Sequence, residues 1–279
     1  MPSENASQHG GYHAPIIGYH RAPLTQKFGA PRQPNLVALT STIEMLAPYD
    51  DPAAFIGMEA FSHIWISWHF HHNYMDKNNN LNRTDSSFRP QVRPPRLGGN
   101  QKIGVFASRS MYRPSALGLS VVKLERIDVV EGRVLLVVSG ADMIDATPII
   151  DIKPYVAYSD AIMHAVSGFA PSAPIVLEVT MTDSAHEQFM GLVNKENLAD
   201  NVSEVKLDTV AARIYQIQNQ LLVTDMGVIK ALIAQDPRPA YRRDDTKKVF
   251  VMRYKSVDVS FRLTESDELQ ITDVVAVSV

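Results

Sequence analysis

Apolar and polar residues alternate along several short stretches in the first 160 residues of the chain. The clearest example is residues 60–72, "AFSHIWISWHFHH", where every second position from 64 to 70 holds a large apolar residue. A strand that buries one face has this period of two, because successive side chains point to opposite faces. We therefore predict a half-buried strand with Ile64, Ile66, Trp68 and Phe70 on its inner face.

A β-hairpin is predicted further along, in residues 117–140. Two apolar runs there flank Glu131 and Gly132, a pair that suits a tight turn. Residues 141–158 continue with a strand-like composition, and long helical patterns are missing up to this point. These stretches predict a compact antiparallel β-barrel domain over residues 15–165, preceded by a loose tail at residues 1–14.

The pattern changes after residues 167–174, "SGFAPSAP", which have the composition of a linker. Residues 208–235 are largely helical in pattern, with one break predicted near Gly227. Residues 247–264 alternate again and predict two strands. The expected fold is therefore mainly β, with a smaller C-terminal α+β domain over residues 172–279.

Composition narrows the class of protein. The chain has 279 residues, 45% of them hydrophobic, and no cysteine, which excludes disulfides, thiolate zinc sites and a cysteine nucleophile. The first residues lack the apolar core of a secretory signal, and no stretch approaches the ~20 apolar residues of a membrane span. Glycine-rich phosphate loops and the GxSxG elbow are missing from the sequence. We expect a soluble, cytoplasmic protein without a dinucleotide-binding or P-loop fold.

Basic residues gather in residues 89–123, although the net charge of the chain is -3. This segment contains no Asp or Glu, and its basic residues are Arg89, Arg93, Arg96, Lys102, Arg109, Arg113 and Lys123. Proline and glycine pairs break the segment into turns, so its arginines lie on loops. Because the planar guanidinium binds phosphate and carboxylate through paired hydrogen bonds, we predict a site for an anionic ligand. Ordinary surface charge is the alternative.

Two shorter basic clusters follow the same reasoning. Residues 21–36 carry three cations in a proline-rich stretch, with a simple strand connector as the alternative. Residues 235–244 place three arginines beside Tyr241. An aromatic ring among arginines can stack on an unpaired base while the arginines hold phosphate. A cap at the C-terminus of a helix is the alternative for this second cluster.

Three histidines, His63, His69 and His71, share the face of the predicted strand opposite the apolar one. Three imidazoles on one face can bind zinc or non-haem iron, which leaves a metal enzyme as an alternative function. No carboxylate lies at an obvious ligand spacing. We therefore favour histidines that hydrogen-bond or contact the substrate, and we predict no metal site.

Five segments together carry a resemblance to one family: "KFGAPRQPNL", "AFSHIWISWHFHH", "VRPPRLGGNQKIGVFASRSMYRPSALGLSVVKL", "DMIDATPIIDIKPY" and "DPRPAY". The chain resembles the TsaA-like (TrmO) tRNA methyltransferases over residues 16–158 and again over residues 232–262. The resemblance implies an all-β barrel, S-adenosylmethionine as cofactor, and methylation of N6 of threonylcarbamoyladenosine at position 37 of tRNA. It also implies a homodimer with cofactor sites near the subunit interface. A non-catalytic tRNA- or nucleotide-binding relative is the alternative.

The resemblance also implies site residues, motif by motif. The implied cofactor residues are Gln33, Pro34, Asn35, His71, His72, Arg113, Lys123 or Leu124, Met143, Ile144, Asp145 and Ala146. The "DPRPAY" element carries over as the substrate and catalysis residues Asp236, Arg238 and Tyr241. The residues expected to contact tRNA are Arg93, Arg96, Arg109 and Arg242. A group that accepts the proton of the methylated nitrogen helps the transfer, and Asp236 and Asp145 are the candidates.

The chain departs from the family pattern in several places, and His69 and His72 are also not typical of the family. It has "YRPSALG" where the family has "FRPNPIG", which places Ser115 and Ala116 in this element. It has Ala146 where the family has glycine, which restricts the conformation of the turn. Residues 78–87 are an insertion in a polar loop. These changes allow a divergent substrate preference within the family.

Overall fold

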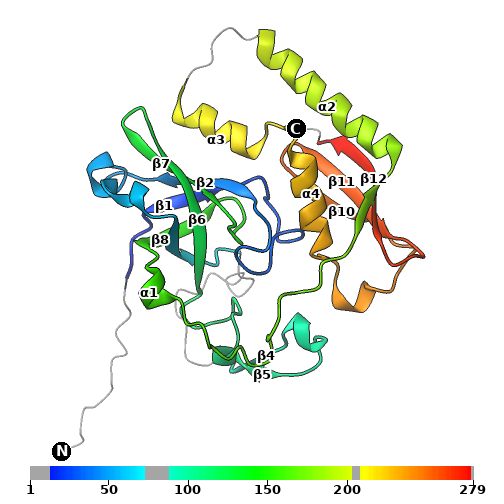
Figure 1. Cartoon of the computed structure of the whole chain (residues 1–279), viewed down its shortest axis with the longest axis horizontal. Coiled ribbons are helices and arrows are strands. Elements are labelled where there is room, and N and C mark those ends of the chain that lie inside the picture. Colours follow the sequence, from blue (N-terminus) through cyan, green and yellow to red (C-terminus); the bar gives the residue numbers. More distant parts are fainter. Residues whose placement is uncertain (1–12, 73–87, 203–207, 278–279) are drawn as a thin grey trace, which may run out of the picture.

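A computed structural model of the chain describes residues 13–72, 88–202 and 208–277 (Figure 1). The inserted residues 78–87 and most of the predicted tail at residues 1–14 lie outside the described residues. Within the described ranges, none of the helices combines the length and the apolar composition that a membrane crossing requires.

The N-terminal half forms a closed antiparallel barrel, as predicted. Its strands are β1 (Gly18–Arg21), β2 (Thr40–Met45), β3 (His63–His69), β6 (Leu117–Val130), β7 (Arg133–Ser139) and β8 (Thr147–Pro154). They are ordered β1-β2-β7-β6-β3-β8, and β8 pairs with β1 to close the sheet. Closure leaves the barrel without an exposed edge strand.

Strand β3 confirms the alternation that predicted it. Ile64, Ile66 and Trp68 are buried inside the barrel, and the residues between them are only partly buried. The predicted hairpin is strands β6 and β7, joined by Glu131 at φ 52° and Gly132 at φ 75°. Two consecutive left-handed residues match the right-handed twist of the flanking strands.

The C-terminal part is an α+β unit. Its strands are β9 (Val179–Met181), β10 (Phe250–Tyr254), β11 (Val257–Leu263) and β12 (Leu269–Ala276), and its helices are α2 (Asp183–Val202), α3 (Val210–Gln218) and α4 (Asp225–Ala234). The sheet has the order β10-β11-β12-β9, with β12 parallel to β9.

Further short elements lie outside the barrel and this sheet: β4 (Gln91–Val92) and β5 (Ile103–Gly104) between β3 and β6, and α1 (Ala157–Asp160) after β8. Short 3-10 helices in the described residues connect the strands and helices: η1 (Pro52–Phe55), η2 (Met58–Ala60), η5 (Pro95–Leu97), η6 (Val105–Ala107) and η7 (Ala240–Arg242).

The predicted break near Gly227 is wrong by several residues. Helix α3 ends at Gln218 and α4 begins at Asp225, so Gly227 lies inside α4. The buried Asp225 carboxylate fixes this start, because it accepts hydrogen bonds from Tyr254 Oη at 2.7 Å and from Leu222 N at 2.8 Å. A glycine inside a helix costs about 1 kcal/mol relative to alanine, which packing of the helix overcomes.

The two halves of the molecule share their cores. Leu24, Val37 and Leu39, which precede β2, pack with the C-terminal sheet rather than inside the barrel. The Phe28 ring stacks on Phe250, with 6.3 Å between ring centroids. Each buried side chain of this size contributes roughly 1.5–3 kcal/mol. In the opposite direction, α3 lies over the barrel and contacts β1 and β2 (Figure 1). The motif at residues 31–35 is therefore held at the junction of the two halves.

Candidate functional site

The loop at residues 31–35 is anchored to the end of the barrel through Asn35. Asn35 N donates to Gly140 O at 2.8 Å, and Asn35 Nδ2 donates to Val121 O at 3.0 Å. Both Asn35 and Gly140 have left-handed backbones, with φ 62° and 82°. A Cβ at position 140 would lie 2.5 Å from Asn35 Oδ1. Only glycine at position 140 lets the two backbone segments approach each other this closely.

Two cationic side chains, Arg109 and Lys27, connect this region of the chain with the basic segment and with the end of β3. Arg109 Nη1 donates to Gln33 Oε1 at 2.6 Å. Lys27 Nζ donates to His72 O and lies 3.8 Å from Met111 Sδ. The folded chain thus brings together the predicted cofactor residues of the first loop, the end of β3 and the basic segment.

Asp142 is a partly buried carboxylate beside these groups that the sequence patterns did not single out. Its Oδ1 accepts from Ser120 Oγ at 2.6 Å, and Ser120 Oγ accepts from Trp68 Nε1 at 3.0 Å. Burial raises the pKa of Asp142, while the Ser120 hydrogen bond and the Arg109 charge oppose the shift. Its place at the first position of "DMIDATP", directly after β7, is the one signal that could have identified it.

His71 lies next to Lys27 and is a neutral imidazole. Burial, then the charges of His72, His69 and Lys27, lower the pKa of His71 to about 4. Its Nε2 is buried and has no hydrogen-bond partner in the described part of the chain. A ligand with a polar group can complete this site.

The described residues give no support to the metal-enzyme alternative. Within residues 13–72, 88–202 and 208–277, no three His, Cys, Asp or Glu side chains are arranged to hold a metal ion. The His63 ring instead pairs with Ser62 Oγ at 2.9 Å and packs edge-on against Tyr155.

The turn at residues 143–146 is held by hydrogen bonds with uncharged partners on three sides. Asp145 Oδ1 accepts from Ala22 N at 3.0 Å and from Gln218 Nε2 at 2.7 Å. Ala146 N donates to His20 O at 2.8 Å, and Ala146 itself has φ 59°. Alanine therefore occupies a left-handed position that glycine adopts without strain. Met143 and Ile144 are buried beneath this turn.

His20 is the fully buried support of that turn. Its Nδ1 donates to Ile144 O at 3.1 Å, so its Nε2 accepts from Ser41 Oγ at 2.7 Å. Burial lowers the pKa of His20 to about 4, against smaller opposing effects of Ile144 O and Asp145. The neutral ring is the form that makes both hydrogen bonds.

The "DPRPAY" turn is held by charge. Arg238 is 2% exposed, and its Nε donates to Asp236 Oδ1 at 2.7 Å. Arg243 Nε lies 3.2 Å from Asp236 Oδ2, and Arg32 Nη2 donates to Asp236 O at 3.4 Å. Tyr241 is 82% exposed. The Arg32 contact joins this turn to the first loop within a single chain.

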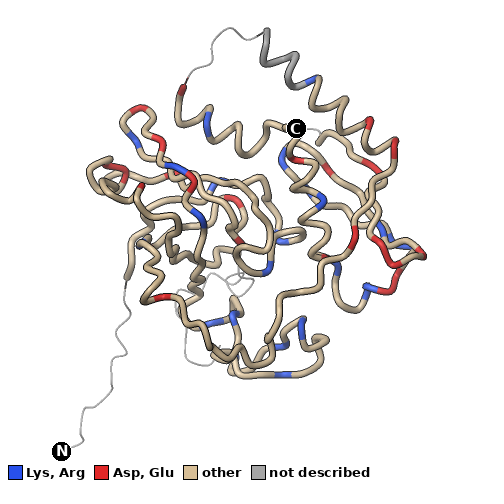
Figure 2. The backbone as a smooth tube through the Cα atoms, in the orientation of Figure 1, with Lys and Arg blue, Asp and Glu red and all other residues tan. Residues whose placement is uncertain are grey.

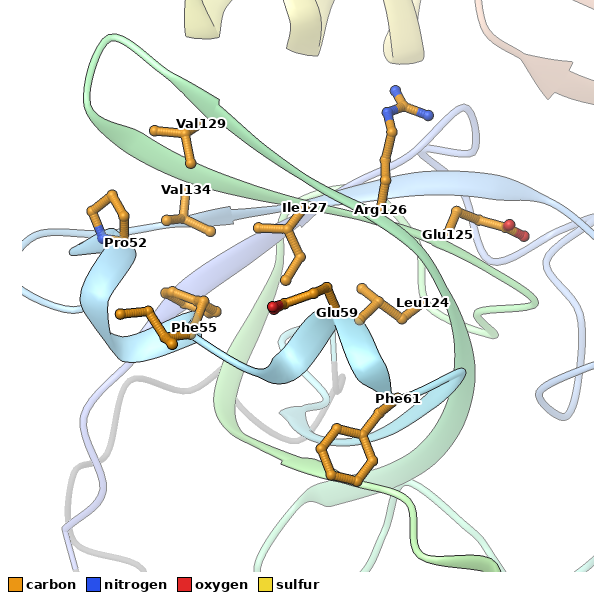
Figure 3. Close-up of a pocket in the computed structure, with 11 residues that line it drawn as sticks. Pro52, Phe55, Glu59, Phe61, Leu124, Glu125, Arg126, Ile127, Val129 and Val134 are labelled. Atoms are coloured by element: carbon orange, nitrogen blue, oxygen red, sulfur yellow. The ribbon is translucent and has the colours of Figure 1, made fainter.

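The other predicted cofactor residues lie around the same end of the barrel or on its wall. Arg113 Nη1 donates to Ser108 O at 2.6 Å, and Lys123 Nζ lies 2.8 Å from Glu125 Oε2. Pro34 is partly buried. Leu124 lines a groove of about 560 Å³ between η1, η2 and β6, together with Phe55 and Phe61 (Figure 3). Of the predicted site residues, Leu124 alone lines this groove.

The arginines of the basic segment are paired with neutral groups. Arg96 Nη2 donates to Ser172 O at 2.7 Å, and the Arg89 guanidinium lies 5.3 Å from the centroid of the Tyr112 ring. Arg242 stacks similarly on Tyr241, at 5.5 Å. The region around β4 and β5 is marked by basic residues without acidic ones (Figure 2). Its positive charge is therefore not neutralised locally.

Left-handed backbone marks the motifs. Seven described non-glycine residues have positive φ, and four of them lie in the segments that carry the resemblance: Asn35, Ala116, Ala146 and Asp236. The other three, Glu131, Lys255 and Asp267, lie in connections between paired strands, β6–β7, β10–β11 and β11–β12. Such conformations persist where the surrounding structure enforces them, and they concentrate at functional sites. This clustering supports a shared site for the four segments.

Comparison with known proteins decides the family. The family model for the tRNA-methyltransferase O N-terminal domain matches residues 19–161, and the model for the TrmO C-terminal domain matches residues 203–277. The chain belongs to the TrmO family. The TrmO relative from Escherichia coli (strain K12), named tRNA (adenine(37)-N6)-methyltransferase, is 34% identical over 253 residues, which is 90% of this chain and 92% of that protein.

A relative and a solved structure from Pseudomonas aeruginosa also match. The relative, named a putative S-adenosylmethionine-dependent methyltransferase RcsF, is 36% identical over 259 residues, covering 92% of this chain and 95% of the relative. The crystal structure of TrmO from that organism superposes with a TM-score of 0.68 at 28% identity, covering 96% of this chain and 99% of that one. The TrmO fold thus extends over both halves of the molecule.

Proposed function

We propose that this protein is an S-adenosylmethionine-dependent methyltransferase that methylates N6 of adenosine at position 37 of tRNA, with threonylcarbamoyladenosine as the acceptor. The observation that carries the proposal is the contact of one loop with both halves of the site. Through Asn35 and Gln33 that loop reaches the barrel, and through Arg32 it reaches Asp236. The name and coverage of the Escherichia coli relative support the same reaction.

The residues at the end of the barrel suit S-adenosylmethionine. The partly buried Asp142 carboxylate complements a sulfonium cation, and Arg109 complements a carboxylate. The unpartnered Nε2 of His71 offers a hydrogen bond, and His71 is uncharged near pH 7 and so does not repel the cation. When bound, this cofactor supplies an activated methyl group. The task of the chain is then to align the accepting nitrogen and to remove its proton.

We propose Asp142 as the group that accepts this proton. Asp145 and Asp236 remain predicted candidates, yet their carboxylates already hold the two turns: Asp145 binds Gln218, and Asp236 binds Arg238 and Arg243. Asp142 has one side-chain hydrogen bond, from Ser120, and burial raises its pKa toward the range of an effective base. We therefore assign Asp145 and Asp236 to positioning.

The tRNA is proposed to bind across the basic segment and the "DPRPAY" turn. Arg93, Arg96, Arg109 and Arg242 carry charge that no nearby carboxylate of their own segment removes, apart from the 3.8 Å approach of Asp245 to Arg242. The exposed Tyr241 ring suits stacking on an unpaired base of the anticodon loop. A carboxylate within the basic segment would repel both the phosphates and the threonyl carboxylate, which explains its acid-free composition.

We further propose a cytoplasmic homodimer. The segment after the barrel exposes a row of apolar side chains, Tyr158, Ile162, Met163 and Val166, all more than 70% exposed. Exposed apolar side chains gathered in one segment favour association with a second copy of the chain. Light scattering of the purified protein tests this, with twice the mass of the chain as the expected result. The cytoplasm follows from the proposed tRNA substrate.

Methyl transfer from labelled S-adenosylmethionine tests the activity. We expect label in tRNA that carries threonylcarbamoyladenosine at position 37, and none when guanosine replaces this nucleoside. Isothermal titration with S-adenosylmethionine alone separates an enzyme from a tRNA-binding relative, because the relative gives no heat. Heat without transfer to any tRNA would contradict the proposed acceptor.

A further inference from the structure

Three arginines gather around Asp236, two at its carboxylate and one at its main-chain oxygen. Arg238 Nε and Nη2 donate to the two Asp236 oxygens at 2.7 and 3.3 Å, and Arg238 Nη1 donates to Arg243 O at 2.9 Å. This arrangement uses most of the acceptor capacity of the carboxylate. Arg32 and Arg243 add two more positive charges to the same cluster.

Neither of these two additional guanidiniums is well satisfied. Arg243 Nε lies 3.2 Å from Asp236 Oδ2, but it is buried and makes no properly directed hydrogen bond within the described residues. Arg32 makes one long contact, 3.4 Å, to a main-chain oxygen. Burial and the charge of Arg243 lower the pKa of Arg32, and Asp236 only partly offsets this. The neighbouring Asp245 approaches Arg242 at 3.8 Å.

We infer that Arg32 and Arg243 form a binding site for an oxyanion of the tRNA substrate, with Asp236 and Arg238 as its buried support. The inference rests on the proposed function and deepens it. Two forked guanidiniums suit a planar carboxylate or a phosphate, because each presents paired donors. Arg238, which the sequence assigned to the substrate, is only 2% exposed and acts on the ligand through Asp236.

The location of the site makes it selective. Arg32 directly precedes Gln33 of the proposed cofactor loop, and Arg243 follows the exposed Tyr241. An anion held between them bridges the barrel and the C-terminal turn. The anion has two sources, the carboxylate of the threonylcarbamoyl group or a phosphodiester of the anticodon loop. Both use the same donors, so binding to modified and unmodified tRNA distinguishes them.

The test compares Arg32→Gln and Arg243→Gln with Arg253→Gln as a matched control. Arg253 lies in the same half of the molecule and is already neutralised by Asp258, with hydrogen bonds of 2.7 and 2.9 Å. Dissociation constants are measured for threonylcarbamoylated and unmodified tRNA over a series of salt concentrations. Melting temperatures check that each variant folds, and the 41% exposed Arg243 side chain makes its variant the more tolerant one.

Each source predicts a distinct result. If the anion is the threonyl carboxylate, both variants weaken binding of modified tRNA by about 10- to 100-fold and leave unmodified tRNA unchanged. If it is a phosphate, both tRNAs weaken together and the salt slope falls by roughly one unit. Binding of both tRNAs equal to that of Arg253→Gln overturns the site. If binding is unchanged in this way while the wild type still transfers methyl groups to tRNA, only this inference fails. If the wild type neither binds nor methylates tRNA, the proposed function fails too.

Discussion

The turn at residues 144–146 and the turn at residues 236–243 both carry strained backbone, but different forces hold them. Around Asp145 the supports are a main-chain amide, the Gln218 amide and the neutral His20 ring. Around Asp236 the supports are guanidinium groups. Hydrogen bonds from uncharged donors add no positive charge, whereas a cationic cluster attracts anions over the Debye length of about 10 Å. The first turn therefore suits a small cofactor and the second suits tRNA.

The largest effect is expected at the charged turn. Asp236→Asn leaves the buried Arg238 without its counter-charge, which we expect to lower the free energy of unfolding by about 3 kcal/mol. Denaturant titration measures this, with single-turnover methylation in parallel. A loss of methyl transfer on the order of 100-fold at unchanged stability would instead make Asp236 the proton acceptor.

The next effect is on the chemistry at the barrel. Asp142→Asn removes the proposed base and should lower single-turnover methyl transfer by about 100-fold, with tRNA affinity unchanged. The wild-type rate should fall with decreasing pH at an apparent pKa above that of an ordinary aspartate, and the variant should lose this dependence. Near-normal rates in the variant would show that Asp142 is not the proton acceptor and would leave Asp145 or His71 as the candidates.

The neutral support of the first turn predicts a pH dependence of stability. His20 has a pKa of about 4 when folded and about 6.5 when unfolded, so the unfolded chain takes up the proton first as the pH falls. Between these values His20 should cost about 1.4 kcal/mol of stability per pH unit. His71 shifts in the same direction, so the measurement is the difference between wild type and His20→Asn. Parallel curves for the two proteins contradict the account.

The basic segment should contribute to tRNA affinity mainly through charge. Arg96→Ala and Arg109→Ala are each expected to weaken tRNA binding and to flatten the salt slope by roughly one unit. Arg109→Ala should also weaken cofactor binding, because Arg109 holds Gln33, whereas Arg96→Ala should not. Equal cofactor affinity in both variants would show that Arg109 does not support the cofactor site at the barrel.

The smallest effect concerns backbone strain. Ala146→Gly relieves the left-handed conformation and should raise stability by about 0.5–1 kcal/mol. Ala146→Val should lower it, because a β-branched residue is poorly tolerated at positive φ. Thermal melts of the pair give the answer, and destabilisation by glycine would show that the alanine methyl is needed for packing.

Local patterns predicted the strands because their burial is periodic. The alternation at Ile64, Ile66 and Trp68 and the Glu131-Gly132 turn both appear in the fold as expected. The partner of the segment around Leu24 and Val37 could not be predicted, because apolar residues without a period do not specify which core they join. The start of α4 was missed for a related reason, since the contact of Tyr254 with Asp225 is distant in sequence.

The sequence could predict which segments form the site, but not how their residues contact one another. The resemblance identified the segments that carry Asn35, Ala146 and Asp236, and their contacts became visible with the fold. Asp142 and Arg243 were not singled out as site residues because their roles depend on burial. A raised pKa and an unpartnered donor exist only when strands and turns from distant parts of the sequence enclose the group.

Nucleoside mass spectrometry after a single turnover identifies the methylated nucleoside and so tests the proposed reaction itself. The wild-type protein is incubated with S-adenosylmethionine and tRNA carrying threonylcarbamoyladenosine at position 37, and the tRNA is then digested to nucleosides. The account predicts that the threonylcarbamoyladenosine peak is replaced by one heavier by a single methyl group, with the added methyl on N6. A methyl group on another nucleoside, or an unchanged digest from protein that binds the cofactor, would contradict it.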